Sequence, residues 1–280
     1  MKSLSESRRN AAKKALKIRQ EEGIGFERPC DIYELISKRG LDLQFFAVPT
    51  LEGMYLEDGS TRRLCVSAFR PVGRQRFTAA HELGHCVLMH GTKVDTIESL
   101  KKIESDDLDE KLADTFASAI MMPNNAVHAG FRLRNMNMTC PSPTDVYRVA
   151  TWLGVGYTTL IHHMFYVMRN ISEEKHKSLL RREPKEIKTE LVKQVTTKEV
   201  FVLDHLWKNC RVHAQVGDFL LGISNSNSYP IASEVCEGCV TATKVGNSIV
   251  TTLCGNPVYV SVCRESYIGF YEYRYLMEEE

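Results

Sequence analysis

The residues whose types and spacing most clearly suggest chemistry are His81 and His85, four positions apart in the run HELGH. On an α-helix, residues four apart are separated by about 40° around the axis and about 6 Å along it. Two imidazoles placed in this way can bind one tetrahedral metal ion, with Glu82 between them near a bound water molecule. The run therefore predicts a catalytic zinc site in which Glu82 is the general base of a hydrolysis.

A catalytic zinc site needs a third protein ligand, and the next helix-forming stretch supplies one. Glu110 follows His85 by 25 positions, in a stretch whose apolar residues recur with helical spacing. Asp114 is four residues further on and shares a helix face with Glu110, so its carboxylate can accept the N–H of a ligating histidine. We therefore expect His81, His85 and Glu110 to bind one zinc ion, with Asp114 behind a histidine.

The elements that must position these residues are two helices that follow a short run of strands. Strand-like alternation covers residues 41–69, with a turn at Asp58-Gly59. Helices are predicted over residues 74–91 and 109–122, separated by a polar connection. Small alanines on the second helix allow the two helices to approach closely.

Two other classes of zinc site are excluded by position. The elongated motif HExxHxxGxxH requires glycine and histidine where this sequence has Leu88 and Gly91. The inverted order HxxEH is absent as well. The class that remains is the zincin whose third ligand is a glutamate.

Residues 29–123 resemble the ImmA/IrrE family of zinc metallopeptidases. The motifs that carry the resemblance are RQRFTAAHELGH at 74–85 and ExxADxFASxxMMP at 110–123, preceded by EGMYLEDGSTRRLCVSAF. The resemblance implies that His81, His85 and Glu110 bind zinc and that Glu82 is catalytic. It also implies a cytoplasmic endopeptidase that cleaves a partner helix-turn-helix repressor after a signal such as DNA damage, and so derepresses stress or anti-phage genes.

The fold class expected for the whole chain is α+β. Residues 1–170 are expected to form a mostly helical, zincin-like metallopeptidase domain with a small N-terminal sheet, including a helical hairpin at 144–168. Residues 171–199 are highly charged and are expected to be a linker or helix. Residues 200–280 are β-rich and loosely resemble the GAF-like sensor domain of some family members, which suggests a regulatory domain.

Composition and cysteine usage indicate a soluble cytoplasmic protein. The 280 residues carry 36 Lys+Arg against 35 Asp+Glu, so the overall charge gives no case for nucleic-acid binding. Nine cysteines without a secretory signal indicate reduced thiols. The uncharged runs at 149–168 and 245–263 contain too many polar or turn residues for membrane spans.

A local basic patch nevertheless remains open as a nucleic-acid contact. Such a patch can follow the backbone of single-stranded DNA, and some relatives are thought to be activated by this ligand. The five candidate residues precede the first metal-binding helix: Arg62, Arg63, Arg70, Arg74 and Arg76.

Two further expectations concern latency and the oxyanion. Cys140 lies in a proline-flanked loop, and its thiolate could occupy the open position on zinc and keep the enzyme inactive. Packing or exposure without function is the ordinary alternative. The sequence does not locate an oxyanion donor, although His90, Tyr55 and Arg76 are candidates.

Two rival functions differ in class from a peptidase. A non-catalytic regulator would bind the repressor through the zinc fold without cutting it. A transcription factor would bind DNA through residues 144–168, but the second helix there, GYTTLIHHMFYV, lacks the Arg, Lys, Asn and Gln side chains that read bases. A hairpin that completes the peptidase core is therefore favoured over a DNA reader.

Overall fold

The fold was obtained as a computed structural model that describes residues 3–59, 61–96, 107–224 and 229–276. Helices and strands are both abundant, which confirms the α+β fold class. The chain divides into two compact units. The first comprises Met1–Val127, Leu153–Val155 and Ile268–Tyr271, and the second comprises His128–Trp152, Gly156–Tyr267 and Glu272–Glu280.

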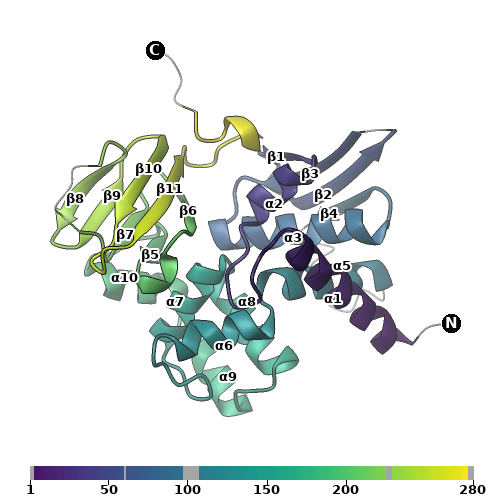
Figure 1. Cartoon of the computed structure of the whole chain (residues 1–280), viewed down its shortest axis with the longest axis horizontal. Helices are drawn as coiled ribbons and strands as arrows, with labels where there is room; N and C mark the ends of the chain where they lie inside the picture. Colours follow the sequence, from purple (N-terminus) through teal and green to yellow (C-terminus); the bar gives the residue numbers. More distant parts are fainter. Residues whose placement is uncertain (1–2, 60, 97–106, 225–228, 277–280) are drawn as a thin grey trace. The chain divides into compact units, whose positions relative to one another are not determined.

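The first unit contains a five-stranded sheet and the helices that pack with it (Figure 1). The strand order is β12-β1-β3-β2-β4, in which β1 is parallel to β3 and the other pairs are antiparallel. Its elements in chain order are α1 (Leu4–Glu21), α2 (Ile32–Lys38), β1 (Asp42–Phe46), β2 (Leu51–Asp58), β3 (Thr61–Ser67), α3 (Val72–Leu88), β4 (Lys93–Thr96), α5 (Leu108–Met121) and β12 (Gly269–Phe270).

The two helices expected to carry the metal ligands, α3 and α5, pack directly against each other, and α3 also lies on β2 and β3. Their contact face is built from small residues. A Cβ atom added to Gly84 of α3 would lie 3.1 Å from the Cα atom of Ala113 in α5. This close approach brings the side chains on the two facing surfaces within reach of a single ion.

Helix α3 ends earlier than the predicted end at Gly91. Met89 adopts a left-handed conformation with φ of 61°, and its N–H bonds back to the carbonyls of Cys86 and His85. The chain therefore leaves the helix after Leu88. The residues that follow fold back toward the end of α3.

Strand β4 lies in the stretch predicted to be a polar connection. Its residues pair with β2 in an antiparallel register, with Val94 opposite Met54 and Asp95 opposite Gly53. The strand is four residues long and contains a lysine and an aspartate, so the sequence shows no apolar alternation that would predict it. The connection between residues 97 and 106 lies outside the described residues.

Arg19 joins helix α1 to α5 inside the first unit. The side chain is fully buried, and its guanidinium donates to the carbonyls of Ile120, Gly25 and Arg28, each at 2.6 Å. The three carbonyls partly offset the cost of burying this charge, although Nε has no partner among the described residues. The contact fixes α1 against the helix that carries Glu110.

The second unit combines helices with two small sheets. The sheets have the strand orders β10-β11-β6 and β5-β7-β9-β8. Its elements are α7 (Pro143–Leu153), α8 (Tyr157–His162), a π-helical turn (His163–Val167), α9 (Glu173–Leu180), α10 (Pro184–Val192), β5 (Val200–Val202), a 3-10 turn (His205–Trp207), β6 (Arg211–Gln215), β7 (Phe219–Leu221), β8 (Ala232–Cys236), β9 (Cys239–Ala242), β10 (Gly246–Thr251) and β11 (Pro257–Cys263), while α6 (Asn124–Arg132) and a 3-10 turn (Tyr271–Tyr273) cross the division.

The compact units divide after Val127, with Leu153–Val155 grouped with the first unit, and the domain boundary expected near residue 170 stays a prediction. Specific contacts join the hairpin region to the β-rich part. Arg134 Nε lies 2.6 Å from Asp204 Oδ2, and Trp152 Nε1 donates to the carbonyl of Leu206 at 3.1 Å. The segment expected to be a charged linker or helix contains helices α9 and α10, and α10 buries Ile187. The GAF-like resemblance of the C-terminal strands stays a prediction.

Two general features agree with the composition. Each of the nine cysteines is a free thiol. Within the described ranges, no helix has the length and apolar character needed to cross a bilayer.

Candidate metal centre

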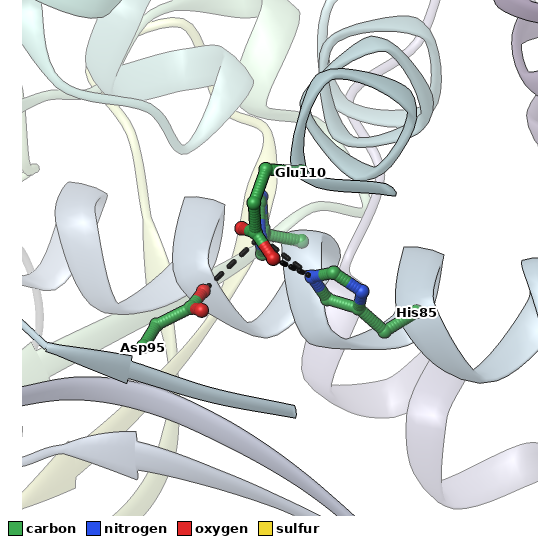
Figure 2. A group of neighbouring side chains, drawn as sticks. His85, Asp95 and Glu110 are labelled. Carbon is green, nitrogen blue, oxygen red and sulfur yellow. Dashed lines mark hydrogen bonds and ion pairs between the residues drawn. The ribbon is translucent and has the colours of Figure 1, made fainter. Parts of the chain in front are cut away.

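Two neighbouring helices bring together the three residues predicted to bind zinc. His81 and His85 project from α3, and their Nε2 atoms are 2.9 Å apart. Glu110 projects from the first turn of α5, with Oε2 at 3.2 Å from His81 Nε2 and Oε1 at 3.5 Å from His85 Nε2. Figure 2 shows the Glu110 carboxylate directed at the His85 ring. Donors bound tetrahedrally to zinc are about 3.3 Å from one another, so these spacings suit a shared ion.

A fourth donor, Asp95 of β4, belongs to the same cluster and was missed by the sequence analysis. Its Oδ2 atom is 3.1 Å from His81 Nε2, and its side chain is buried. Figure 2 shows the Asp95 carboxylate entering from the side of the sheet, opposite the helix that carries Glu110. One donor atom from each of the four residues lies within 4.8 Å of the other three. Asp95 reaches the cluster because β4 pairs with β2, and this strand pairing is the feature that would have identified it as a donor.

Further side chains hold the two imidazoles from behind. The Nδ1 atom of His81 is 2.9 Å from Asp114 Oδ1, and because a carboxylate only accepts, this nitrogen carries the proton. Nε2 of His81 is then free to bind a metal. His85 Nδ1 is 2.9 Å from His90 Nδ1, and His90 Nε2 in turn is 3.5 Å from Asp109. Such contacts fix ring orientation and tautomer at metal sites.

The charges of the cluster suit a cation. Burial alone lowers the pKa of His81, but contacts with Asp114, Asp95 and Glu110 outweigh it and raise this pKa well above its usual value. Burial raises the pKa of Glu110, yet hydrogen bonds from His81 and His85 lower it far below the ordinary range. Two imidazoles and two carboxylates are a donor set that zinc accepts. The residues present therefore fit a zinc ion.

Glu82 belongs to α3, and its fully buried carboxylate lies next to Gly53 of β2. Neither of its carboxylate oxygens has a hydrogen-bond partner of ordinary geometry among the described residues. Burial raises the pKa of Glu82 well above its usual value, and the carboxylates of Asp95 and Glu110 raise it further against the opposing effect of His81. A buried carboxylate of this kind needs water or another polar partner, which a hydrolytic site supplies.

The family comparison covers this whole site. Residues 38–164 match the family described as the IrrE N-terminal-like domain, peptidase M78. This part of the chain is similar to that family, which points to a metallopeptidase-like fold. The four clustered donors and Glu82 all lie within the matched residues, and the cluster could hold a metal.

The similarity of this chain to a protein of known structure is weak. A Mycobacterium tuberculosis transcriptional regulator of known structure shares 19% identity, with a TM-score of 0.38 over 58% of this chain. The match spans 51% of that regulator, or about half of its length. No curated protein matches the chain.

The five arginines suggested as nucleic-acid contacts each bond to another group of the protein. Arg70 and Arg74 both pair with the buried carboxylate of Glu52, at 2.7 Å and 2.9 Å. Arg76 is itself buried and donates to the carbonyl of Cys30 at 3.1 Å. Because Arg76 is not accessible, it cannot contact a nucleic acid in this conformation.

The remaining two arginines of that group also have protein partners. Arg62 pairs with Glu57 at 3.1 Å. Arg63 pairs with Asp42 at 3.6 Å and lies over the ring of Phe270, 5.1 Å from its centre. The five arginines therefore contact groups of the protein itself, and the carboxylates of Glu57, Asp42 and Glu52 offset part of their charge. Their contact with nucleic acid stays a prediction.

Cys140 and the oxyanion candidates have the following positions. Cys140 is exposed in the second unit, where its N–H donates to Asn137, and its role as a latency thiol stays a prediction. His90 is occupied behind His85, and the buried hydroxyl of Tyr55 contacts Cys86. His90 thus supports His85, and the role of an oxyanion donor stays a prediction for each candidate.

Proposed function

We propose that the chain is a zinc-dependent endopeptidase. The observation that carries this proposal is the convergence of His81, His85 and Glu110 on one point, with the buried carboxylate of Glu82 beside it. A zinc ion bound there would lower the pKa of a water molecule and polarise the scissile carbonyl. This donor set with an adjacent glutamate is the arrangement that hydrolysis of a peptide bond requires.

The chain's own residues have separable tasks in such a reaction. Glu82 accepts a proton from the attacking water and returns it to the leaving amine. Asp114 and His90 hold the two imidazoles in the orientation that leaves their Nε2 atoms facing the cluster. Gly53 leaves the space in which the Glu82 carboxylate lies.

The substrate we propose is a partner helix-turn-helix repressor, cleaved after a signal such as DNA damage so that stress or anti-phage genes are derepressed. Support comes from the family resemblance of the motifs at 74–85 and 110–123. Single-stranded DNA is the activator to be tested first, on the same grounds. The internal pairing of the five arginines weakens the case for their binding it directly.

A second candidate is a regulator that binds its repressor without cutting it. The observation that favours this alternative is Asp95, which adds a fourth protein donor where a catalytic site leaves a position for water. In this case the metal would stabilise the fold and the binding surface. The two candidates make opposite predictions for proteolysis.

The decisive experiment compares the wild-type chain with Glu82→Gln. Each protein is loaded with zinc and incubated with candidate helix-turn-helix repressors, with and without single-stranded DNA, and the products are identified by mass spectrometry. A peptidase gives a discrete cut that disappears in Glu82→Gln. Formation of a stable complex by both proteins without any cut rejects the peptidase and supports the binding regulator.

A further inference from the structure

The aspartate on β4 has a place in the cluster that a three-ligand catalytic site does not provide. We propose that Asp95 is a fourth protein ligand of the metal, and that it closes the coordination position that hydrolysis needs open. This inference rests on the zinc centre of the proposed function and deepens it, because it assigns a latent state to that centre. The assignment follows from donor spacing, from which nitrogen Asp95 contacts, and from how β4 is held.

The spacing of three donors from His81 is close to that of ligands on one tetrahedral ion, and all four donors lie within 4.8 Å of one another. The separations from His81 Nε2 are 2.9 Å to His85, 3.1 Å to Asp95 and 3.2 Å to Glu110. Ligand atoms bound to one tetrahedral zinc are separated by about 3.3 Å. Zinc sites with four protein ligands are typically closed and structural, whereas catalytic sites keep one position for water.

The atom that Asp95 contacts distinguishes a ligand from a supporting residue. A supporting carboxylate binds the far nitrogen of a ligating histidine, as Asp114 does at Nδ1 of His81. Asp95 instead lies against Nε2, the nitrogen directed at the metal position. A carboxylate oxygen on this side of the ring lies where it could bind the same ion as the other ligands.

The backbone around Asp95 holds this carboxylate in place. Asp95 pairs with Gly53 in the register of β4 and β2, so its position depends on a strand. Lys93, on the same strand, reaches Asp107 at 3.3 Å and Asp109 at 3.1 Å near the start of α5. The strand that carries Asp95 is therefore tied to the helix that carries Glu110.

Opening the site requires an exchange of ligands and no change of oxidation state. With a metal bound, the Asp95 carboxylate would leave its coordination position and a water molecule would take its place, and Glu82 would accept the proton of that water. Because β4 is an edge strand with β2 as its neighbour in the sheet, separation of this short strand withdraws Asp95 while His81, His85 and Glu110 stay on their helices.

The test uses the full chain loaded with cobalt(II), whose visible absorption reports its ligands, titrated with inorganic azide. The variants are wild type, Asp95→Ala, and Glu34→Ala on α2 as a control that removes a carboxylate outside the site. We expect azide to leave the wild-type and control spectra unchanged. It should shift the Asp95→Ala spectrum with saturation, and zinc affinity, measured by competition with a chelator, should fall about tenfold or more in that variant.

An azide response in the wild type equal to that of Asp95→Ala overturns the proposal, as does an unchanged zinc affinity. If Asp95→Ala does not fold, Asp95→Asn, which keeps the side-chain shape, takes its place, and the wild-type titration alone remains decisive. Absence of metal binding in every variant rejects the zinc centre and the proposed function with it. Azide binding confined to the Asp95 variants, without cleavage of any repressor, retains the ligand assignment and rejects the peptidase.

Discussion

The carboxylate of Glu82 lies against Gly53, so closely that a Cβ atom at position 53 would overlap it. Gly53 follows an irregularity of β2, where the pairing with β4 shifts between Leu51 and Gly53. The intervening residue, Glu52, is buried and paired with two arginines. The sheet thus provides the space for the proposed general base, although that base belongs to helix α3.

Replacing Gly53 with alanine should disable hydrolysis without disturbing the metal. The added methyl group displaces the Glu82 carboxylate, and misplacement of a catalytic group by about 1 Å can reduce the rate roughly 100-fold. Zinc affinity should fall much less than the rate, because His81, His85 and Glu110 project from α3 and α5 and not from β2. The measurements are the rate of product formation and a chelator competition for zinc.

The control for this prediction is the melting temperature of Gly53→Ala compared with that of the wild type. A large fall in melting temperature would show that the alanine acts by a route other than Glu82, such as overlap with the side chain of Thr78.

The part of the site that could be predicted from sequence is the part fixed by helical spacing. His81, His85, Glu110 and Asp114 occupy positions four apart on two helices, so local geometry places each pair on one face. Asp95 could not be found in this way, because its place depends on the pairing of a four-residue strand with a distant one.

Other features escaped prediction because they depend on contacts between distant segments. His90 supports His85 because the helix ends at Leu88 and Met89 turns the chain back, which the glycine at 91 did not indicate. Similarly, the sequence did not indicate that Arg70 and Arg74 share the buried carboxylate of Glu52. Pairing of this kind depends on contacts between distant segments, which helical spacing does not reveal.

Removing the carboxylate behind His81 should weaken metal binding. In Asp114→Ala, Nδ1 of His81 loses its acceptor, and the ring is freer to rotate and to adopt the wrong tautomer. Loss of such a contact typically reduces metal affinity by about 10- to 100-fold. The affinity is measured by chelator competition, with Glu34→Gln on α2 as a control that alters a carboxylate outside the site. Equal affinities in the two variants would contradict this role of Asp114.

Zinc should stabilise the folded chain, because the clustered donors are assembled only by folding. At a free zinc concentration about 100 times the dissociation constant, the gain is about 2.7 kcal/mol and the melting temperature rises by several degrees. A chelator should reverse the shift. Glu82→Gln should keep the shift and His85→Ala should lose most of it, since only the second substitution removes a donor. Thermal melts with and without zinc make the comparison, and an equal shift in both variants would place the ion elsewhere.

Asp218 should make the stability of the second unit depend on pH. Burial raises its pKa from an ordinary 3.8 to about 7, even though its oxygens accept N–H groups from Glu199 at 2.9 Å and Gln215 at 2.7 Å. Between these values the folded form keeps a proton that the unfolded form has lost. Stability is therefore fully present below about pH 4 and decreases as the pH rises toward 7, by about 1 to 4 kcal/mol.

Urea unfolding from pH 5 to pH 8 tests this dependence, followed by tryptophan fluorescence because Trp152 and Trp207 both lie in the second unit. Asp218→Asn removes the titrating carboxyl, so its free energy of unfolding should change less across this range. Its stability at pH 5 should be somewhat lower than that of the wild type, since one side-chain oxygen cannot accept both N–H groups in the same way. An equally steep decrease in the variant would assign the pH dependence to other groups, such as the neighbouring Glu199 and Lys198.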